Sequence, residues 1–367
     1  MAQLVVEPVG VGEVQRSPQP KADGTLPDLL DRQLEAGHRS PSPLLTIAAW
    51  LPRAVVAKRD RTDRSGDHRG GPPVACPVAV LIAVPNVSEG RDPAVVAAIG
   101  VAYGAAGAAV LDTHADPDHH RAVHTLAAPP RVLADALVAG AREAVARIDL
   151  RTARGVHPHV GALDVAPVVH LDDARRGAAA AEALVVAERL GDEVGLPVFL
   201  YGVLAGGRTR AFLRRGGRDA LARRIAGGEL APDFGPARLH PTAGAVLVAA
   251  RAPLVAFNVE LAPPAGVAQA RAIAAAIREG GAEGLPGVRA LGLELTARGA
   301  IAQVSTNVED HRAVPLAAVV AAVARHATVA GCELVGLAPA AAFAAFPGDV
   351  PVRGRRTVEE ALEALSS

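Results

Sequence analysis

Hydrophobic and polar positions along residues 80–350 fall into blocks whose period changes, and these blocks predict strands and helices in turn. Residues 80–84 form a short apolar run that ends at a proline, which predicts a first strand. Asp92 and Pro93 supply an N-cap and a proline suited to the first helical position, so a helix should follow to about residue 106. Apolar side chains recur at helical spacing over residues 129–148, which predicts a second helix.

The remaining blocks continue this alternation to residue 330. Strands are expected at 108–111, 163–169, 197–201, 245–250, 254–259, 288–295 and 301–305, and helices at 172–190, 266–278 and 315–330. The pattern predicts an α/β (α+β) fold of two α/β sandwich subdomains, each a mixed sheet with helices on one face. We place the subdomains at residues 80–250 and 251–350, with the boundary near Ala250 and a C-terminal tail at 351–367.

The first 79 residues differ from the rest of the chain because they lack a periodic core-forming pattern. Their apolar stretch at 44–57 is too short to span a membrane, and it begins too far from Met1 for an ordinary signal peptide. A polar run rich in arginine follows at 58–71. Residues 1–79 are therefore expected to be a disordered extension, or else translation begins near residue 80.

Composition and charge indicate the size of the core and the classes of binding partner to expect. Half of the 367 residues are hydrophobic and the formal net charge is zero, so a large core is expected. Zero net charge gives no reason to expect nucleic acid or a membrane surface as a partner. Cys76 and Cys332 are the only cysteines, which excludes a disulfide framework and favours a reducing cytoplasm.

A histidine in a turn at 155–164 is the first candidate for chemistry. The stretch reads Gly-Val-His-Pro-His-Val-Gly-Ala-Leu-Asp and places His157 just before the predicted strand at 163–169. A histidine held on a stiff turn at a strand end can meet a substrate and exchange a proton near neutral pH. A purely structural turn histidine is the alternative, since most histidines are not catalytic.

A second polar cluster follows the predicted strand at 108–111. It reads Asp-Thr-His-Ala-Asp-Pro-Asp-His-His-Arg and ends at Arg121. Such a cluster is also typical of a solvated, inert turn. Its potential metal ligands are His114, Asp116, Asp118, His119, His120 and His124. We expect no metal site, because no His-x-x-x-His pair here has the helical context that metal motifs show, and Asp-Pro-Asp favours a turn.

Several further motifs stand in a fixed order along the chain. They are Val-Pro-Asn-Val-Ser-Glu-Gly-Arg at 84–91, Ala-Pro-Asp-Phe-Gly-Pro at 231–236, Ala-Phe-Asn-Val-Glu-Leu at 256–261 and Ala-Gln-Val-Ser-Thr-Asn at 302–307. Together with the histidine turn, and in this order and spacing, they resemble the formiminotransferase family (glutamate formimidoyltransferase). The resemblance extends over about residues 81–347.

The resemblance implies an activity and a cofactor. Members of the family transfer a formimidoyl group from N-formimino-L-glutamate to N5 of tetrahydrofolate, in histidine degradation. Tetrahydrofolate is therefore the expected co-substrate, and the site is expected in the cleft between the two subdomains. Dimers are common in the family, so a homodimer is expected.

The resemblance also implies roles for particular residues. His157 matches the family's catalytic histidine and would act as the general acid and base. Asp116 would stabilise the cationic amidine, and Arg121 would bind a carboxylate in a bidentate fork. Asp164 would either orient His157 or serve only the structure of its strand.

Substrate and folate contacts are expected from three of these motifs, from the stretch 235–244 and from Arg251 at the subdomain boundary. The expected residues are Asn86, Gly235, Pro236, Arg238, His240, Thr242, Gly244, Arg251, Asn258, Gln303 and Asn307. The stretch 235–244 matches the family's folate-contacting segment, although by itself it would be taken for an interdomain linker. The polar residues at strand ends could equally satisfy backbone groups in turns. The arginine-rich stretch 208–218 is either a solvated face or a positive approach path for polyglutamylated folate.

The sequence departs from the family pattern near the expected site. Val156 and His159 stand where the family has Glu and Arg around His157, and His114 and Val203 each replace an acid. Loss of a transition-state partner can cost on the order of 100-fold in rate. Two alternatives therefore remain: a folate-binding paralogue with an altered (formyl) donor or lost catalysis, and a metal-dependent hydrolase.

Overall fold

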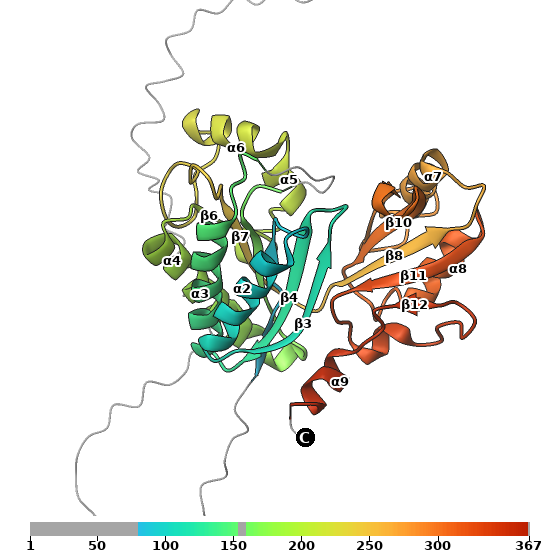
Figure 1. Cartoon of the computed structure of the whole chain (residues 1–367), viewed down its shortest axis with the longest axis horizontal. Helices are drawn as coiled ribbons and strands as arrows, with labels where there is room; N and C mark the ends of the chain where they lie inside the picture. Colours follow the sequence, from blue (N-terminus) through green and yellow to red (C-terminus); the bar gives the residue numbers. More distant parts are fainter. Residues whose placement is uncertain (1–79, 153–158, 366–367) are drawn as a thin grey trace, which may run out of the picture. The chain divides into compact units, whose positions relative to one another are not determined.

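Two β-sheets with helices packed on them make up the part of the chain that the structure describes. The structure is a computed structural model and describes residues 80–152 and 159–365 (Figure 1). The expectations for residues 1–79 lie outside these described residues. The fold class predicted from the sequence is confirmed.

The first sheet is mixed. Its strands are β1 (Leu81–Ala83), β2 (Asn86–Val87), β3 (Ala109–Asp116), β4 (Arg121–Ala128), β5 (Leu163–Val169), β6 (Val198–Leu200) and β7 (Val246–Arg251). β3 and β4 form an antiparallel hairpin, and β1 and β2 both lie between β4 and β5, antiparallel to each. β7 then pairs in parallel with β5 and β6.

The second sheet is antiparallel except at one edge. It contains β8 (Val255–Leu261), β9 (Val288–Leu295), β10 (Ile301–Val308), β11 (Val329–Val335) and β12 (Val352–Arg353), in the order β12-β11-β8-β10-β9. Only the β11–β12 pair is parallel among these described strands. Alternate residues of β8 and β10 are packed in the core, which leaves Asn258, Gln303 and Asn307 on the opposite face.

The longer helices cover one face of each sheet, and short helices contact the other face of the first sheet. α2 (Pro93–Ala105), α3 (Val132–Arg147) and α4 (Arg176–Val194) pack on the first sheet, and α7 (Val267–Ile277) and α8 (Leu316–Ala324) on the second (Figure 1). The short helices α5 (Arg210–Arg214) and α6 (Gly217–Ala226) contribute to a smaller cluster with β6 and β7. α9 (Val358–Glu363) packs against β1 and β3. None of the described helices is long and apolar enough to cross a membrane.

Two carboxylates fix the first helices. Asp92 caps α2 as predicted, because its Oδ1 accepts hydrogen bonds from Ala94 N (2.8 Å) and Val95 N (3.3 Å). α3 has no such cap of its own. Instead the buried Glu182 of α4 accepts from Arg131 N (2.8 Å) and Ala134 N (2.9 Å) at its first turn.

Small aliphatic residues dominate the core of the first sheet, and Tyr103 is its largest buried side chain. The Tyr103 ring meets His124 of β4 edge to face, with ring centroids 5.2 Å apart. His124 Nδ1 lies 3.1 Å from Thr113 Oγ1, and its other ring nitrogen has no partner among the described residues. Burial lowers the pKa of His124 to about 4, so the ring is neutral in the folded protein.

Several elements differ from the sequence-based prediction. The strand expected at 108–111 extends to Asp116, and the structure adds β4, β11, β12, α5, α6 and α9, which were not predicted. β4 is buried at every position, so it lacks the alternation that marks a half-exposed strand. The helix predicted at 315–330 ends at Ala324, and β11 begins at Val329.

Candidate functional site

A cavity of about 690 Å³ is lined by residues of both sheets, a size suited to an organic ligand. From the first sheet and α5 come Asn86, His114, Asp116, His119, Arg121, Arg210 and Arg214, and from the second sheet Asn258, Ser305 and Asn307. Arg251 lies in the lining at the end of β7, where burial lowers its pKa. The structure thus brings together Asn86, Asp116, Arg121, Arg251, Asn258 and Asn307, which the sequence predicted as site residues.

The motif at 84–91 packs against the end of the β3–β4 hairpin. Gly90 is required there, since a Cβ atom at this position would lie 2.5 Å from Arg121 N, 2.7 Å from Arg121 O and closer still to Asp116 O. Glu89 Oε1 accepts hydrogen bonds from the backbone of Gly90 (2.8 Å) and Arg91 (2.7 Å). His120, at a positive φ of 50°, lies 3.3 Å from Glu89 Oε1 through its Nδ1. The motif therefore fixes the position of the hairpin end.

Arg121, in the cavity lining, is held by the side chains of Asn86 and Asp164. Its Nε donates to Asn86 Oδ1 (2.8 Å) and its Nη2 to Asp164 Oδ2 (2.9 Å), while Arg214 also pairs with Asp164. Burial lowers the pKa of Arg121 to about 10, against the opposing effect of Asp164. Asp164 is fully buried in β5, and its other oxygen accepts from Val160 N (2.8 Å). Asp164 thus links the Arg121 side chain to the backbone at Val160.

Positive charge collects on one side of the cavity. Arg121, Arg210, Arg214 and Arg251 line it there, and Arg210 lies close enough to Arg121 and Arg251 to lower the pKa of both. The acidic lining residues Glu279 and Glu309 instead pair with Arg289, at 3.0 and 3.2 Å. This side is therefore suited to a ligand that carries carboxylates.

Asp116 and His119 form a second polar group at the hairpin end. Asp116 Oδ2 lies 2.9 Å from His119 Nδ1, and Asp116 Oδ1 accepts from His119 N at 2.9 Å. Burial alone would raise the pKa of Asp116, but hydrogen bonds from His119 and the charge of Arg298 bring it to about 2. His114, two residues before Asp116, has a buried Nε2 with no partner among the described residues.

Gln303 and Asn258 also serve the second sheet itself. Asn258 Nδ2 and Gln303 Nε2 donate to Glu333 Oε2 at 3.3 and 3.4 Å, and Glu333 in turn pairs with Arg298 at 2.8 Å. Gln303 is fully buried, and it is not among the described residues that line the cavity. A structural role of the kind left open by the sequence is therefore present for Asn258 and Gln303.

The predicted folate-contacting stretch lies elsewhere in the described part of the chain. Gly235, Pro236, Arg238, His240, Thr242 and Gly244 are not among the described residues that line the cavity. Gly235, with a φ of 76°, packs against Gly191 at the end of α4, and His240 Nδ1 accepts from Ala243 N at 3.1 Å. Gly244, with a φ of 70°, pairs with Gly161 in an isolated bridge. The stretch therefore packs beside the starts of β5 and β7.

His157, the predicted catalytic residue, lies outside the described residues, as does Val156. The histidines of the 112–124 cluster are separated by strand geometry: His114 and His119 line the cavity, whereas His124 is buried with Tyr103. Among the residues that the structure describes, no three His, Cys, Asp or Glu side chains are arranged to hold a metal ion.

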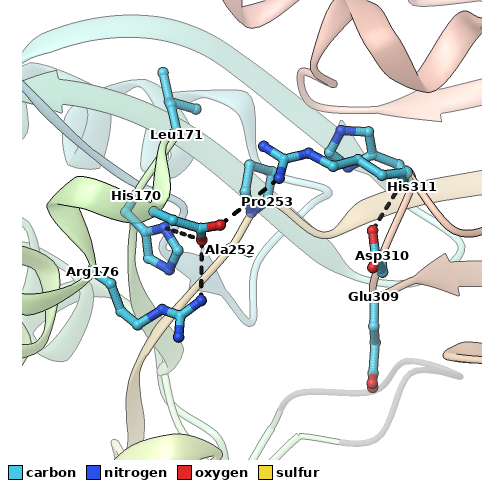
Figure 2. A pocket seen from close by; sticks show the side chains of 10 residues that line it. His170, Leu171, Arg176, Ala252, Pro253, Glu309, Asp310 and His311 are labelled. Carbon is cyan, nitrogen blue, oxygen red and sulfur yellow. Dashed lines mark hydrogen bonds and ion pairs between the residues drawn. The ribbon is translucent and has the colours of Figure 1, made fainter.

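A smaller cavity of about 240 Å³ lies beside the segment that joins the sheets (Figure 2). His170, Arg176, Pro253 and His311 are among its lining residues. Asp173 pairs there with Arg176 at 3.1 Å, with Arg312 at 4.0 Å and with His170 at 4.0 Å. The Arg176, Arg312 and Asp173 side chains are each about two-thirds exposed, so these contacts form a surface ion cluster.

Sequence reasoning did not assign Arg210, Arg214, His114 and His119 to the substrate site. The arginine-rich stretch 208–218 was the available signal for the first two, and its alternative as a positive approach path agrees with their place in the cavity lining. No sequence motif indicated that Arg214 pairs with Asp164, because 50 residues separate them along the chain.

Comparison with known proteins agrees with this architecture. The family model of the formiminotransferase domain, N-terminal subdomain, matches residues 80–251, and that of the formiminotransferase domain matches residues 256–347. A glutamate formimidoyltransferase of Streptococcus pyogenes serotype M1 is 35% identical over 273 residues, which cover 72% of this chain and 90% of that protein. The chain belongs to the formiminotransferase family.

Longer members of the family match the same region. The formimidoyltransferase-cyclodeaminases of Rattus norvegicus and Gallus gallus are 36% and 37% identical, over 70% of this chain and 49% of each of those proteins. The chain therefore spans about half the length of these curated relatives. The resemblance predicted from the sequence motifs is confirmed.

Proposed function

We propose that the protein transfers a formimidoyl group from N-formimino-L-glutamate to N5 of tetrahydrofolate, as a step of histidine degradation. Relatives named glutamate formimidoyltransferase support the transfer. The observation that carries the proposal for this chain is Arg121, which Asn86 and Asp164 hold in the lining of a cavity rich in arginine. A donor with two carboxylates and a folate with a glutamate tail both match that charge.

The reaction requires binding and two proton transfers. Arg121, fixed in orientation by Asn86 and Asp164, would bind a donor carboxylate, and the carboxylate of Asp116 would stabilise the cationic amidine. N5 attacks the amidine carbon, a tetrahedral intermediate forms, and the bond to the glutamate nitrogen breaks. His157 would take the N5 proton. Tetrahydrofolate supplies the nucleophilic nitrogen when bound.

A transfer assay with the purified protein tests this function. We expect turnover of tetrahydrofolate and N-formimino-L-glutamate, and loss of about 100-fold in kcat/KM in Arg121→Lys, because lysine lacks the planar fork. Arg142→Lys is the matched control, since Arg142 is an exposed arginine that pairs with Glu193 at 2.8 Å. It should keep full activity.

The outcome of the assay also addresses the alternatives. A parent protein that binds tetrahydrofolate by calorimetry but transfers nothing would contradict the proposal and favour a folate-binding paralogue with another donor. Breakdown of the donor without tetrahydrofolate, abolished by a chelator, would instead favour a metal-dependent hydrolase. Light scattering would test the homodimer that we propose from family resemblance.

A further inference from the structure

The Asp116–His119 pair has the form of a proton-transfer group. Both side chains line the larger cavity and are about nine-tenths buried, at 10% and 12% exposure. One carboxylate oxygen contacts the His119 ring at Nδ1 and the other accepts from the His119 backbone, each at 2.9 Å. A carboxylate bound to Nδ1 in this way fixes the orientation and the tautomer of an imidazole, and proton exchange then occurs at Nε2.

The surroundings hold this pair in place. Gly90 lies so close to the hairpin end that a Cβ atom at this position would overlap the backbone of Asp116 and Arg121. From the second sheet, Thr296 Oγ1 lies 3.4 Å from Asp118 Oδ1, and Arg298 adds positive charge near Asp116. Asp116, with a pKa of about 2, remains ionised wherever the protein is folded at ordinary pH. The pair is therefore preorganised for one orientation of the ring.

The β-hairpin register places the pair beside the residue that would hold the donor. Asp116 lies directly opposite Arg121 in the β3–β4 ladder. If Arg121 binds a donor carboxylate, the glutamate part of the donor lies next to the Asp116–His119 pair. The folate nitrogen must approach the amidine carbon from another direction than the departing nitrogen occupies.

We propose that His119, oriented by Asp116, protonates the departing glutamate nitrogen. This inference rests on the proposed function and divides the proton transfers between two histidines. The N5–carbon bond forms and the N5 proton passes to His157. The carbon–nitrogen bond to glutamate breaks, and its electron pair takes the proton of His119 Nε2. Both histidines then return to their starting states by proton exchange with water.

The decisive experiment compares two donors with one variant. His119→Asn keeps an N–H group near the position of Nδ1, facing Asp116, but has no titratable nitrogen in place of Nε2. One donor is N-formimino-L-glutamate. The other is its thioimidate analogue, in which sulfur replaces the departing nitrogen, and a thiolate can leave without being protonated because thiols are much stronger acids than amines.

We expect His119→Asn to lower kcat with the nitrogen donor by about 100-fold or more and to change kcat with the sulfur donor by less than about threefold. The matched control is His326→Asn, since His326 forms a similar pair with Glu283 (2.9 Å) but lines neither cavity. It should leave both rates unchanged. Circular dichroism establishes that each variant is folded.

Each result separates the two proposals. Equal loss with both donors would assign His119 a structural role, and unchanged kcat with both would exclude it from proton transfer; either overturns the inference while the transferase function stands. A parent protein that does not transfer from the nitrogen donor would overturn the function and this inference together.

Discussion

Arg121 and Asp164 form a buried ion pair across neighbouring parts of the first sheet, with Nη2 and Oδ2 2.9 Å apart. Asp164 is fully buried and also pairs with Arg214, so one carboxylate compensates two guanidinium groups in the cavity lining. Arg210 adds a further positive charge nearby. The stability of the folded protein and the orientation of Arg121 therefore both depend on Asp164.

We expect Asp164→Asn to lower the free energy of unfolding by about 3–5 kcal/mol, because it leaves buried guanidinium groups without a compensating charge. Asp173→Asn is the matched control, since Asp173 also contacts two arginines, Arg176 and Arg312, but is 65% exposed. Its loss should stay within about 1 kcal/mol. Urea unfolding of the three proteins measures both values, and equal losses would show that burial is not what makes the Asp164 pair important.

A buried neutral histidine should make the fold sensitive to mild acid. The pKa of His124 falls from 6.5 to about 4 on folding because the side chain is buried. The stability that depends on neutral His124 is fully present above pH 6.5 and is lost as the pH falls toward 4. The shift corresponds to about 3 kcal/mol over that window.

His124→Phe keeps an aromatic ring against Tyr103 and removes the titration. We expect its free energy of unfolding to fall less steeply than that of the parent between about pH 7 and pH 4.5, measured by urea unfolding at several pH values. The same variant tests whether His124 causes the loss of stability in acid. If its slope equals that of the parent, another group dominates the acid response.

A side chain at Gly90 should displace the hairpin end. Gly90→Ala places a Cβ atom within 2.7 Å of Arg121 O and 2.5 Å of Arg121 N, so the hairpin must shift. We expect a loss of about 3 kcal/mol in the free energy of unfolding and a raised KM for the donor. Gly177→Ala, in α4 with open space around its Cβ position, should instead stabilise the protein by about 0.5–1 kcal/mol. A Gly90→Ala protein with parental stability and KM would contradict this account.

Local signals in the sequence predicted local structure well. The cap at Asp92 and the helix that follows Pro93 were predicted because their causes lie within a few residues. The β4 strand was missed because burial on both faces leaves no alternation to detect. The family motifs contributed single residues, such as Asn86 and Arg121, that the structure places in the lining of the larger cavity.

Contacts between distant segments could not be predicted in the same way. Asp164 was expected either to orient His157 or to serve the structure of its strand, whereas its pairing with Arg214 depends on how α5 returns over the sheet. His119 was considered only as a potential metal ligand, because its role follows from a turn that brings its ring back to Asp116. Tertiary geometry, rather than residue type, decides these assignments.

The contact between Tyr103 and His124 has a spectroscopic consequence. The chain holds two tyrosines and one tryptophan, and Tyr103 and Tyr201 both belong to the half built on the first sheet. Trp50 lies outside the described residues. Intrinsic tyrosine emission therefore reports on the first sheet and its helices alone, with an imidazole beside one of the two emitters. Unfolding of the second sheet alone changes no tyrosine that belongs to it, so following it by fluorescence requires an indole introduced there.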